Sequence, residues 1–347
     1  MQLAIDATSI IDVRAPAEYA KAHLPNSTNL PILTDDERHQ VGLTYKQAGN
    51  QAATELGHKL VSGSVKQQRI DSWLAAVRET DTTQLMCWRG GARSRIAQEW
   101  LQAAGVDLHR IPGGYKARRQ ECLALLEHAC NKPWWVLGGK TGVGKTVAIQ
   151  QTNHSIDLEG LAQHRGSAFG SFPVNAAGEA HVQPAQATFE NFLAYAAACH
   201  TGDQIVVEDE SRMIGRTALP QSWHSHMQQS PVVLIEADLA TRAEHIYQEY
   251  VAQPLHSGAS ADLLKTHLRD CLKRISRRLG GAKHQDIDQQ LVAAFANQAS
   301  HQAWITSLLR DYYDPMYEYQ LAKKSSRIRF RGPLPEAVAF INQQTQS

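Results

Sequence analysis

A glycine-rich segment in the middle of the chain has the spacing of a phosphate-binding loop. Gly139 and Gly144 stand in the pattern GxxxxGK[ST], which Lys145 and Thr146 complete. Glycines let backbone N–H groups turn towards phosphate oxygens, the lysine reaches the terminal phosphates and the hydroxyl holds Mg²⁺. The pattern therefore predicts a site for a di- or triphosphate, without saying which one. The residues expected to bind phosphate here are Gly139, Thr141, Gly142, Gly144, Lys145 and Thr146.

Charged side chains further along the chain add to this predicted site. The apolar run 205–207 leads directly into three acids, of which Asp209 is the central one. An acid after a buried strand is the usual second magnesium contact beside such a loop, so we expect Asp209 to share the ion with Thr146. Arg165 and Arg212 are predicted to stabilise the negative charge of the bound or departing phosphate.

A cysteine in the first third of the chain lies in a loop rich in glycine and arginine. The segment from Cys87 to Ser94 contains two glycines and the arginines Arg89 and Arg93. Its amides could surround an anion, and the positive charges favour the reactive thiolate, so these three residues are the candidate catalytic set. Two chemistries fit: sulfur or selenium transfer through a persulfide or perselenide on Cys87, and phosphate ester cleavage, since Cys-x5-Arg-Ser also describes cysteine phosphatases. The other four cysteines lie in apolar or helical surroundings and are expected to be structural.

The last third of the chain concentrates basic side chains in two regular patterns. Four basic residues between 265 and 277 recur every four residues on a predicted helix, and leucines occupy another side of that helix. Three arginines between 327 and 331 alternate along a predicted strand. Four tyrosines between residues 312 and 319 could stack on unpaired bases. Either pattern alone fits a solvated surface, but together they favour contact with a phosphate backbone. The seven bases are Lys265, Arg269, Lys273, Arg277, Arg327, Arg329 and Arg331.

The elements that must position these residues alternate between short strands and helices. This alternation predicts an α/β fold with parallel sheets, because parallel strands need crossover connections that are usually helical. The cysteine loop and the phosphate loop would each follow a strand and precede a helix. Beyond about residue 260 the pattern is mostly helical. The expected strands are 9–14, 84–87, 108–111, 134–137, 204–207 and 231–235, and the expected helices are 94–104, 117–129 and 146–151.

Length and composition indicate a globular protein of two domains. The 347 residues exceed the usual size of one domain, and we place the boundary after residue 125. Hydrophobic residues make up 43% and charged residues 20%, which is ordinary for a water-soluble protein, and no apolar run is long enough for a membrane helix. The five cysteines form no CxxC pair, and the first residues lack a signal pattern, so we expect a cytoplasmic protein without disulfides or zinc.

The net charge of +1 is unevenly distributed along the chain. Residues 1–125 carry a net charge of +2, residues 126–262 carry −7 and residues 263–347 carry +6. The near-neutral total therefore does not exclude a nucleic-acid partner.

Several sequence strings resemble a known family. Residues 12–19, 23–31 and 112–115, together with the Cys87 loop, resemble a rhodanese domain. A rhodanese domain followed by a P-loop domain resembles the tRNA 2-selenouridine synthase family. The resemblance covers nearly the whole chain and implies a rhodanese-like parallel-sheet domain at 1–125 and a P-loop NTPase-like α/β domain with a helical, basic extension at 126–347. Further strings that agree with the family are 157–162, 164–167, 208–212 and 312–317.

The resemblance also implies an activity, co-substrates and partners. The family uses geranyl diphosphate to geranylate the 2-thio group of wobble-position 5-substituted 2-thiouridine in tRNA. It then replaces the S-geranyl group with selenium from selenophosphate, which would arrive through a perselenide on Cys87 or by direct acceptance there. Mg²⁺ would assist at the P-loop, tRNA would contact the basic C-terminal residues, and an enzyme that supplies selenophosphate would be a further partner.

One departure from the commonest rhodanese pattern bears on the substrate. The loop from Cys87 to Arg93 spans seven residues, where simple sulfurtransferases usually have six, and the longer loop leaves room for a tetrahedral selenophosphate. Two other functions stay open from the residues alone. One is a rhodanese–kinase fusion that transfers sulfur and phosphorylates a small molecule with ATP. The other is a non-catalytic nucleotide sensor, against which the intact Cys87 argues.

Overall fold

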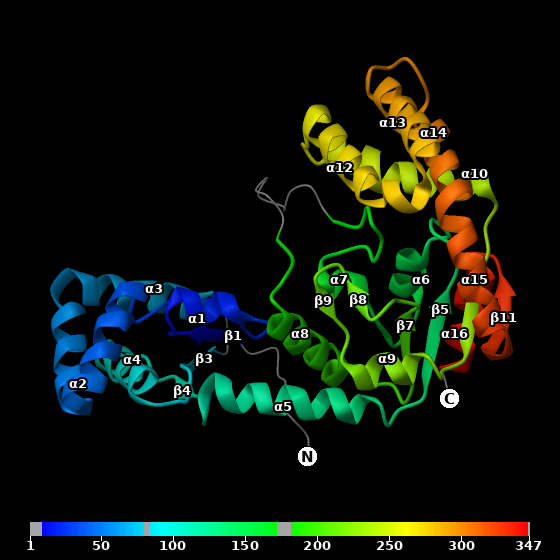
Figure 1. The fold of residues 1–347 in the computed structure, drawn as a ribbon. Coiled ribbons are helices and arrows are strands. Elements are labelled where there is room, and N and C mark those ends of the chain that lie inside the picture. Colours follow the sequence, from blue (N-terminus) through cyan, green and yellow to red (C-terminus); the bar gives the residue numbers. More distant parts are fainter. Residues whose placement is uncertain (1–8, 80–82, 172–181, 346–347) are drawn as a thin grey trace. The chain divides into compact units, whose positions relative to one another are not determined.

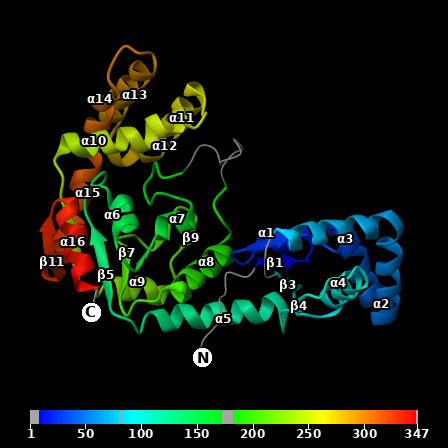
Figure 2. The ribbon, with the colours of Figure 1, turned by 180° about the vertical axis from the view of Figure 1, so that it is seen from behind.

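The computed structural model describes residues 9–79, 83–171 and 182–345. The chain forms two compact units, each described separately below (Figures 1 and 2). The N-terminal unit comprises the chain up to Leu126 together with Ala185–Cys199, and the P-loop unit comprises Glu127–Pro184 and the chain from His200 onward.

The N-terminal unit is built on a four-stranded parallel sheet with the strand order β2-β1-β3-β4. Its strands match the three predicted runs and add β2, and Cys87 follows β3 directly. The strands are β1 (Ser9–Asp12), β2 (Ser27–Asn29), β3 (Thr83–Met86) and β4 (His109–Arg110), and the helices are α1 (Pro16–Lys21), α2 (Asp35–Leu60), α3 (Gly63–Arg78), α4 (Ala92–Ala103) and the larger part of α5 (Gly114–Ala129).

The long helix α2 was not among the predicted elements. It begins with a capping box, in which the Thr34 hydroxyl accepts from the Glu37 N–H and the Glu37 carboxylate accepts from the Thr34 N–H. The helix bends at Gly49, whose φ of 83° is open to glycine but strained for other residues. Helices α3 and α4 pack together, and Trp73 is fully buried between the elements of this core.

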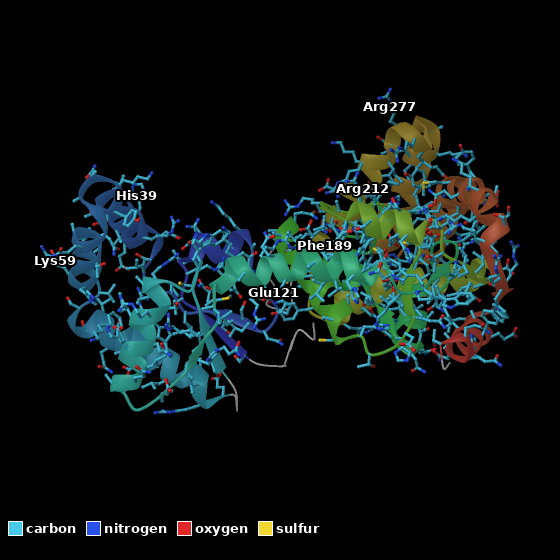
Figure 3. All side chains as sticks on the ribbon, turned by 90° about the horizontal axis from the view of Figure 1, so that it is seen from below. His39, Lys59, Glu121, Phe189, Arg212 and Arg277 are labelled. Atoms are coloured by element: carbon cyan, nitrogen blue, oxygen red, sulfur yellow. The ribbon has the colours of Figure 1, made fainter. Side chains whose placement is uncertain are left out.

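A helix from much later in the chain completes the N-terminal unit. Helix α8 (Gln186–Cys199) lies alongside α5 (Figure 3). Asn191 on α8 is fully buried; its amide donates to the carbonyl oxygen of His23 at 2.8 Å and to the hydroxyl of Tyr115 at 3.2 Å. Arg119 on α5 donates to the Asn191 side chain at 2.9 Å and pairs with Glu190. The predicted domains, 1–125 and 126–347, do not include this return of residues 185–199 to the N-terminal unit.

The P-loop unit is built on a five-stranded parallel sheet with the order β11-β10-β5-β7-β6. The strand before the phosphate loop, β5, is central, and β7, which carries the acids, pairs directly with it. Helices α6 and α16 pack together beside this sheet. The strands are β5 (Trp134–Gly138), β6 (Ser155–Ile156), β7 (Ile205–Glu208), β10 (Val232–Ile235) and β11 (Ile328–Gly332), with a separate hairpin of β8 (Met213–Ile214) and β9 (Thr217–Ala218). The shorter helices are α6 (Lys145–Gln151), α7 (Leu158–Ala162), α9 (Gln221–Met227), α10 (Leu239–Tyr247) and α16 (Leu334–Gln344).

The rest of the P-loop unit is helical, as predicted beyond residue 260. The apolar side of α12 is buried in a core that also contains Tyr312 and Tyr313. Both tyrosines are less than 10% exposed, so the prediction that they stack on unpaired bases is wrong for these two. The helices are α11 (Gln253–His256), α12 (Ala261–Leu279), α13 (Gly281–Phe295), α14 (His301–Leu308) and α15 (Asp314–Lys324), joined by π-helical turns at Gln248–Ala252 and Leu309–Tyr313. Within the described ranges, no helix is long and apolar enough to cross a membrane.

Candidate functional site

The phosphate loop has the backbone that its glycines predict. Gly139, Gly142 and Gly144 have φ angles of 152°, 86° and 90°, which side-chain-bearing residues rarely adopt. Helix α6 begins at Lys145, whose Nζ lies 3.5 Å from the carbonyl oxygen of Gly139 and 5.7 Å from the ring centre of Tyr317. The loop is therefore folded in the form that turns amide groups towards a phosphate.

Buried acids surround Lys145. The carboxylate of Glu208 accepts from the N–H groups of Leu158 and Glu159 at 3.1 and 3.3 Å. Burial raises the pKa of Glu159 and, together with the neighbouring Glu159 charge, raises the pKa of Glu210 well above its ordinary value. Burial disfavours the charge of Lys145, but Tyr317 and these acids outweigh it and raise its pKa. The pocket thus holds a firmly charged ammonium beside two hydrogen-bonded carboxyl groups.

The loop after α7 needs a glycine at position 166. Its φ is 63°, and a Cβ atom added there would overlap the carboxylate oxygens of Glu210 and Glu159. The backbone therefore approaches the carboxyl pair as closely as sterics allow. Glu159 and Glu210 were not predicted as site residues, although both lie in strings that resemble the family.

The side chains predicted to hold Mg²⁺ have other partners. Both carboxylate oxygens of Asp209 accept from Nζ of Lys324, at 2.5 and 2.6 Å, and the Thr146 hydroxyl donates to Glu159 at 3.4 Å. Across the described ranges, no group of three or more His, Cys, Asp or Glu side chains is placed to hold a metal ion. As arranged, these residues do not fit Mg²⁺, because the positive charge beside Asp209 comes from Lys324. A shared ion on Thr146 and Asp209 stays a prediction that would require Lys324 to leave.

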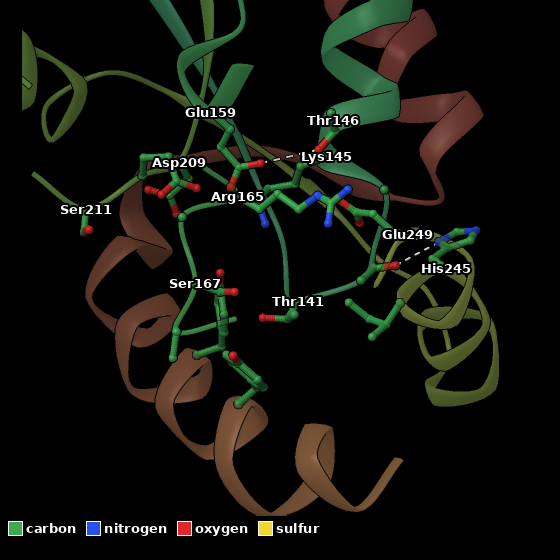
Figure 4. A pocket seen from close by; sticks show the side chains of 18 of the residues that line it. Thr141, Lys145, Thr146, Glu159, Arg165, Ser167, Asp209, Ser211, His245 and Glu249 are labelled. Atoms are coloured by element: carbon green, nitrogen blue, oxygen red, sulfur yellow. Dashed lines mark hydrogen bonds and ion pairs between the residues drawn. The ribbon is translucent and has the colours of Figure 1, made fainter. Parts of the chain in front are cut away.

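A cavity of about 1150 Å³ opens over the phosphate loop (Figure 4). Aromatic and apolar side chains, Tyr317, Met316 and Ile246 among them, form part of its lining. Arg165 lines the cavity as predicted, pairs with Glu249 at 2.7 Å and stacks over the Tyr250 ring at 4.7 Å. The cationic residues that line it are Lys145, Arg165, Arg278, Lys323, Lys324 and Arg327. Arg212 is exposed and is not among the described residues that line this cavity.

Arg242 ties the phosphate loop to the helical part of the unit, a role that sequence reasoning missed. It is buried, and its Nε donates to the carbonyl oxygen of Thr141 at 2.9 Å. Its two terminal nitrogens donate to the carboxylate of Asp314 at 2.6 and 3.1 Å. A planar, bidentate pair of this kind fixes orientation, so α10 and α15 together hold the loop in place.

The candidate catalytic cysteine is buried at the end of β3. The Cys87 side chain is 3% exposed, and its Sγ donates to the hydroxyl of Ser94 at 3.3 Å. Arg93 forms two hydrogen bonds to Glu18, which also pairs with Arg38 at 3.0 Å. Burial opposes the charge of Glu18, but these arginines outweigh it and lower the pKa of Glu18. Arg93 therefore lies near Cys87 in a fixed ion pair.

A second cavity, of about 680 Å³, opens beside Cys87 and lies entirely within the N-terminal unit. The Cys87 loop forms one side of it, including the exposed Arg89, and α2 forms another. Beneath the loop, Arg14 forms a fully buried ion pair with Asp12 at 2.6 Å and stacks over Tyr115 at 4.0 Å. This pair, which supports the loop from the neighbouring strand β1, was not predicted from the sequence.

The predicted basic residues divide into those with an ion-pair partner and those without one in the described part of the chain. Lys265 pairs with Asp262 and Arg269 pairs with Asp288, each at 2.7 Å. Lys273 and Arg277 are exposed and have no ion-pair partner among the described residues, and Arg277 extends outward from α12 (Figure 3).

The three arginines around β11 do not share one face as predicted. Arg329 and Arg331 are exposed on the same side of the strand, and Arg331 pairs with Glu236 at 3.3 Å. Arg327 lies in the 3₁₀ turn Ser325–Arg327 before the strand, because its guanidinium donates to the carbonyl oxygens of Met227 and Ser230 at 3.1 and 2.7 Å. It lines the P-loop cavity instead.

Comparisons with known proteins match both units. The model of the tRNA 2-selenouridine synthase AAA domain matches residues 132–347, and that of the rhodanese-like domain matches residues 2–121. The tRNA 2-selenouridine synthase of Aeromonas salmonicida is 43% identical, covering 98% of this chain and 94% of its own length. Those of Alcanivorax borkumensis and Shewanella sp. MR-7 are 42% and 44% identical, covering 99% and 93% of this chain and 98% and 90% of their own lengths.

Among solved structures, the N-terminal domain of a proposed ATP/GTP-binding protein from Clostridium difficile 630 matches 35% of this chain and 94% of its own length. The identity is 30%, and the TM-score of 0.31 is too low to establish a shared fold. The relatives match nearly the whole length of the chain, and the two domain models together match residues 2–121 and 132–347. The chain therefore belongs to the tRNA 2-selenouridine synthase family.

Proposed function

We propose that this chain is a selenium transferase that converts 2-thiouridine at the tRNA wobble position into 2-selenouridine through an S-geranyl intermediate. The observation that carries the proposal is the P-loop cavity, whose lining combines a phosphate-binding loop with aromatic and apolar side chains. Geranyl diphosphate has an anionic end and an apolar chain, which match the two parts of this cavity.

In the first reaction the sulfur of 2-thiouridine attacks C1 of geranyl diphosphate. The S–C1 bond forms, the C1–O bond breaks and diphosphate leaves. Lys145, held in its charged form, and the amides of the loop stabilise the departing charge. Lys324, which is paired with Asp209, also lines this cavity and would add a second ammonium near the diphosphate.

S-alkylation of a thiouridine also releases the proton on N3, and the cavity contains a group suited to accept it. Glu159 and Glu210 hydrogen-bond to each other within the cavity. A buried carboxylate whose pKa is raised is a stronger base than an exposed one. We assign the acceptance of the N3 proton to this pair.

In the second reaction the selenium of selenophosphate attacks C2 of the S-geranyl base. The C2–Se bond forms, the C2–S bond breaks, and geranylthiolate leaves and takes up a proton. Water then cleaves the Se–P bond, which releases phosphate and returns a proton to N3. Selenium stays at the selenide level throughout, whereas a perselenide on Cys87 would require an oxidant. We therefore favour direct acceptance of selenophosphate in the Cys87 loop, with the Cys87 thiol as the proton donor to the departing sulfur.

The proposed tRNA contacts begin with the basic side chains of α12 that form no ion pair with the described residues. Lys273 and Arg277 are exposed cations that can reach phosphate groups without first breaking an ion pair. Arg269 and Lys265 are already neutralised by acids and are expected to contribute less.

Mass spectrometry of tRNA nucleosides tests the whole proposal. Incubation of the enzyme with 2-thiouridine tRNA and geranyl diphosphate should give S-geranyl-2-thiouridine, and addition of selenophosphate should convert it into 2-selenouridine. Consumption of ATP in the absence of tRNA, with no modified nucleoside, would instead indicate the rhodanese–kinase alternative.

A further inference from the structure

The cavity beside Cys87 differs from a site for a small inorganic anion. Much of its lining is apolar, and its volume of about 680 Å³ lies in the range of pockets that enclose whole organic ligands. Selenophosphate is a compact tetrahedral anion that the amides of the Cys87 loop could hold by themselves. The apolar residues that line the cavity include Ile32, Leu33, Val41, Val61, Ile96 and Trp100.

Several apolar side chains at this cavity remain uncovered. Leu43 and Tyr45, both on α2, are 43% and 59% exposed, and Trp88 of the cysteine loop is 39% exposed. Most other large apolar side chains of the N-terminal unit are packed into its core. Apolar surface gathered around a concave site favours an apolar ligand that would cover it.

The position of Cys87 limits what that ligand can be. Cys87 and Arg89 are both among the residues that line the cavity, so any chain bound there lies close to the place where selenium is proposed to arrive. Lys46 and His39 on α2 add polar groups to the lining. The surroundings thus fit an apolar chain attached to a polyanion.

From this geometry we infer that the cavity between the Cys87 loop and α2 binds the ten-carbon geranyl chain of S-geranyl-2-thiouridine and then of the departing geranylthiol. This inference rests on the proposed function, because it takes the S-geranyl nucleoside as the substrate of the second reaction. It adds a second isoprenoid site, separate from the P-loop cavity. The chain would act as a handle that places C2 beside Cys87.

Chain length provides the test. The full-length enzyme would be given tRNA that carries either S-geranyl- or S-methyl-2-thiouridine, with selenophosphate, and single-turnover formation of 2-selenouridine would be measured. Leu43→Asp places a charge in the cavity at a partly exposed position, and Val41→Trp fills it. Both variants should slow the reaction of the S-geranyl substrate at least tenfold, and should leave the S-methyl substrate within twofold of wild type.

Two controls separate this effect from damage to the fold. Geranylation of 2-thiouridine tRNA by the same variants should be unchanged, and Leu123→Asp, on an exposed part of α5 outside both cavities, should affect neither substrate. Equal losses on the two substrates, or no loss on the S-geranyl substrate, would overturn the inference.

Direct binding distinguishes failure of the inference from failure of the proposed function. Geranylthiol should quench the fluorescence of Trp88 and Trp100 in the wild-type enzyme, and Leu43→Asp should weaken this binding at least tenfold. If wild-type enzyme fails to convert the S-geranyl substrate, the proposed function is wrong, whatever the cavity binds. If conversion occurs but geranylthiol binds equally to wild type and variant, the cavity assignment is wrong.

Discussion

Lys324 and Asp209, 115 residues apart in sequence, form a close ion pair at the phosphate-binding site, with Nζ 2.5 and 2.6 Å from the two carboxylate oxygens. Both side chains are more than 85% buried. Asp209 follows β7 and Lys324 ends α15, so the pair links the sheet to the helical part of the same unit. It would also keep a carboxylate from facing, without compensation, the diphosphate that we propose binds there.

Removal of Lys324 should therefore weaken diphosphate binding. In Lys324→Met the unpaired Asp209 charge would face the phosphates, and we expect the KM for geranyl diphosphate to rise about tenfold, equivalent to about 1.4 kcal/mol. Steady-state geranylation of 2-thiouridine tRNA measures this. Lys283→Met, which removes a lysine more than half exposed, is the matched control. The double variant Asp209→Asn, Lys324→Met should recover part of the loss; no recovery would contradict the charge argument.

The two reactions should be separable by single substitutions in the two units. Lys145→Ala removes the ammonium that stabilises the departing diphosphate, and we expect geranyl transfer to fall by about 10²–10³-fold. Cys87→Ser should leave geranyl transfer within twofold but stop formation of 2-selenouridine. Nucleoside mass spectrometry of each step checks both. Normal selenium transfer by Cys87→Ser would remove the assigned role of the cysteine.

The stability of the P-loop unit should depend on pH through Glu210. Because burial and Glu159 raise its folded-state pKa, the folded protein binds more protons at this group than the unfolded chain does. The free energy of unfolding should thus fall as the pH rises from about 4.5 through the folded-state pKa, by at most about 1.4 kcal/mol per pH unit for this group. Glu210→Gln should make that decline shallower, with Glu208 and Glu159 supplying the rest through their own raised pKa values, whereas Glu336→Gln, at an exposed position, should keep the full decline. Urea unfolding between pH 5 and pH 8 measures the slopes.

The Asp12–Arg14 pair should be important for the stability of the N-terminal unit. Both side chains are fully buried, so Asp12→Asn leaves an uncompensated guanidinium, and we expect a loss of about 3 kcal/mol. Glu99→Gln breaks the Arg95–Glu99 pair, whose side chains are each 52% exposed, and should cost less than about 1 kcal/mol. Urea unfolding of the two variants compares them, and similar losses would mean that burial does not decide the effect.

Binding of tRNA should depend more on the basic side chains of α12 that form no ion pair with described residues than on those that do. Replacing Lys273 and Arg277 together with Ala should weaken binding and reduce the salt slope by about one for each tRNA phosphate that is no longer neutralised. Arg269→Ala should have a smaller effect, because Asp288 already neutralises Arg269. Fluorescence anisotropy with labelled tRNA at several salt concentrations gives the slopes. A slope unchanged in the double variant would place the tRNA elsewhere.

Local sequence patterns predicted the strand and the helix that flank the phosphate loop and those that flank the Cys87 loop. The glycines before Lys145 require a tight loop, and the alternation of apolar runs places that loop after a strand, which the structure shows to be central in its sheet. The same reasoning located Cys87 after β3 and the buried face of α12. These predictions succeed because they depend on residues close together in sequence.

Long-range pairings were not accessible in this way. Lys324 was not predicted as a site residue, since nothing near it in sequence points to Asp209 as its partner. Arg327 continues the alternation of Arg329 and Arg331, yet carbonyl groups about 100 residues away hold it in a turn. The partners of a long side chain are set by tertiary packing, which a repeat of bases does not encode.

Helix α8 has a consequence for how the protein is made. Its Asn191 satisfies polar groups of His23 and Tyr115, so we expect the N-terminal unit to be complete only after residue 199 has left the ribosome. By then β5, α6, β6 and α7 of the other unit have already been synthesised. Domains usually fold in the order of synthesis. We therefore expect the N-terminal unit, which is synthesised first, to remain incomplete until α8 has been translated, after part of the P-loop unit has already been made.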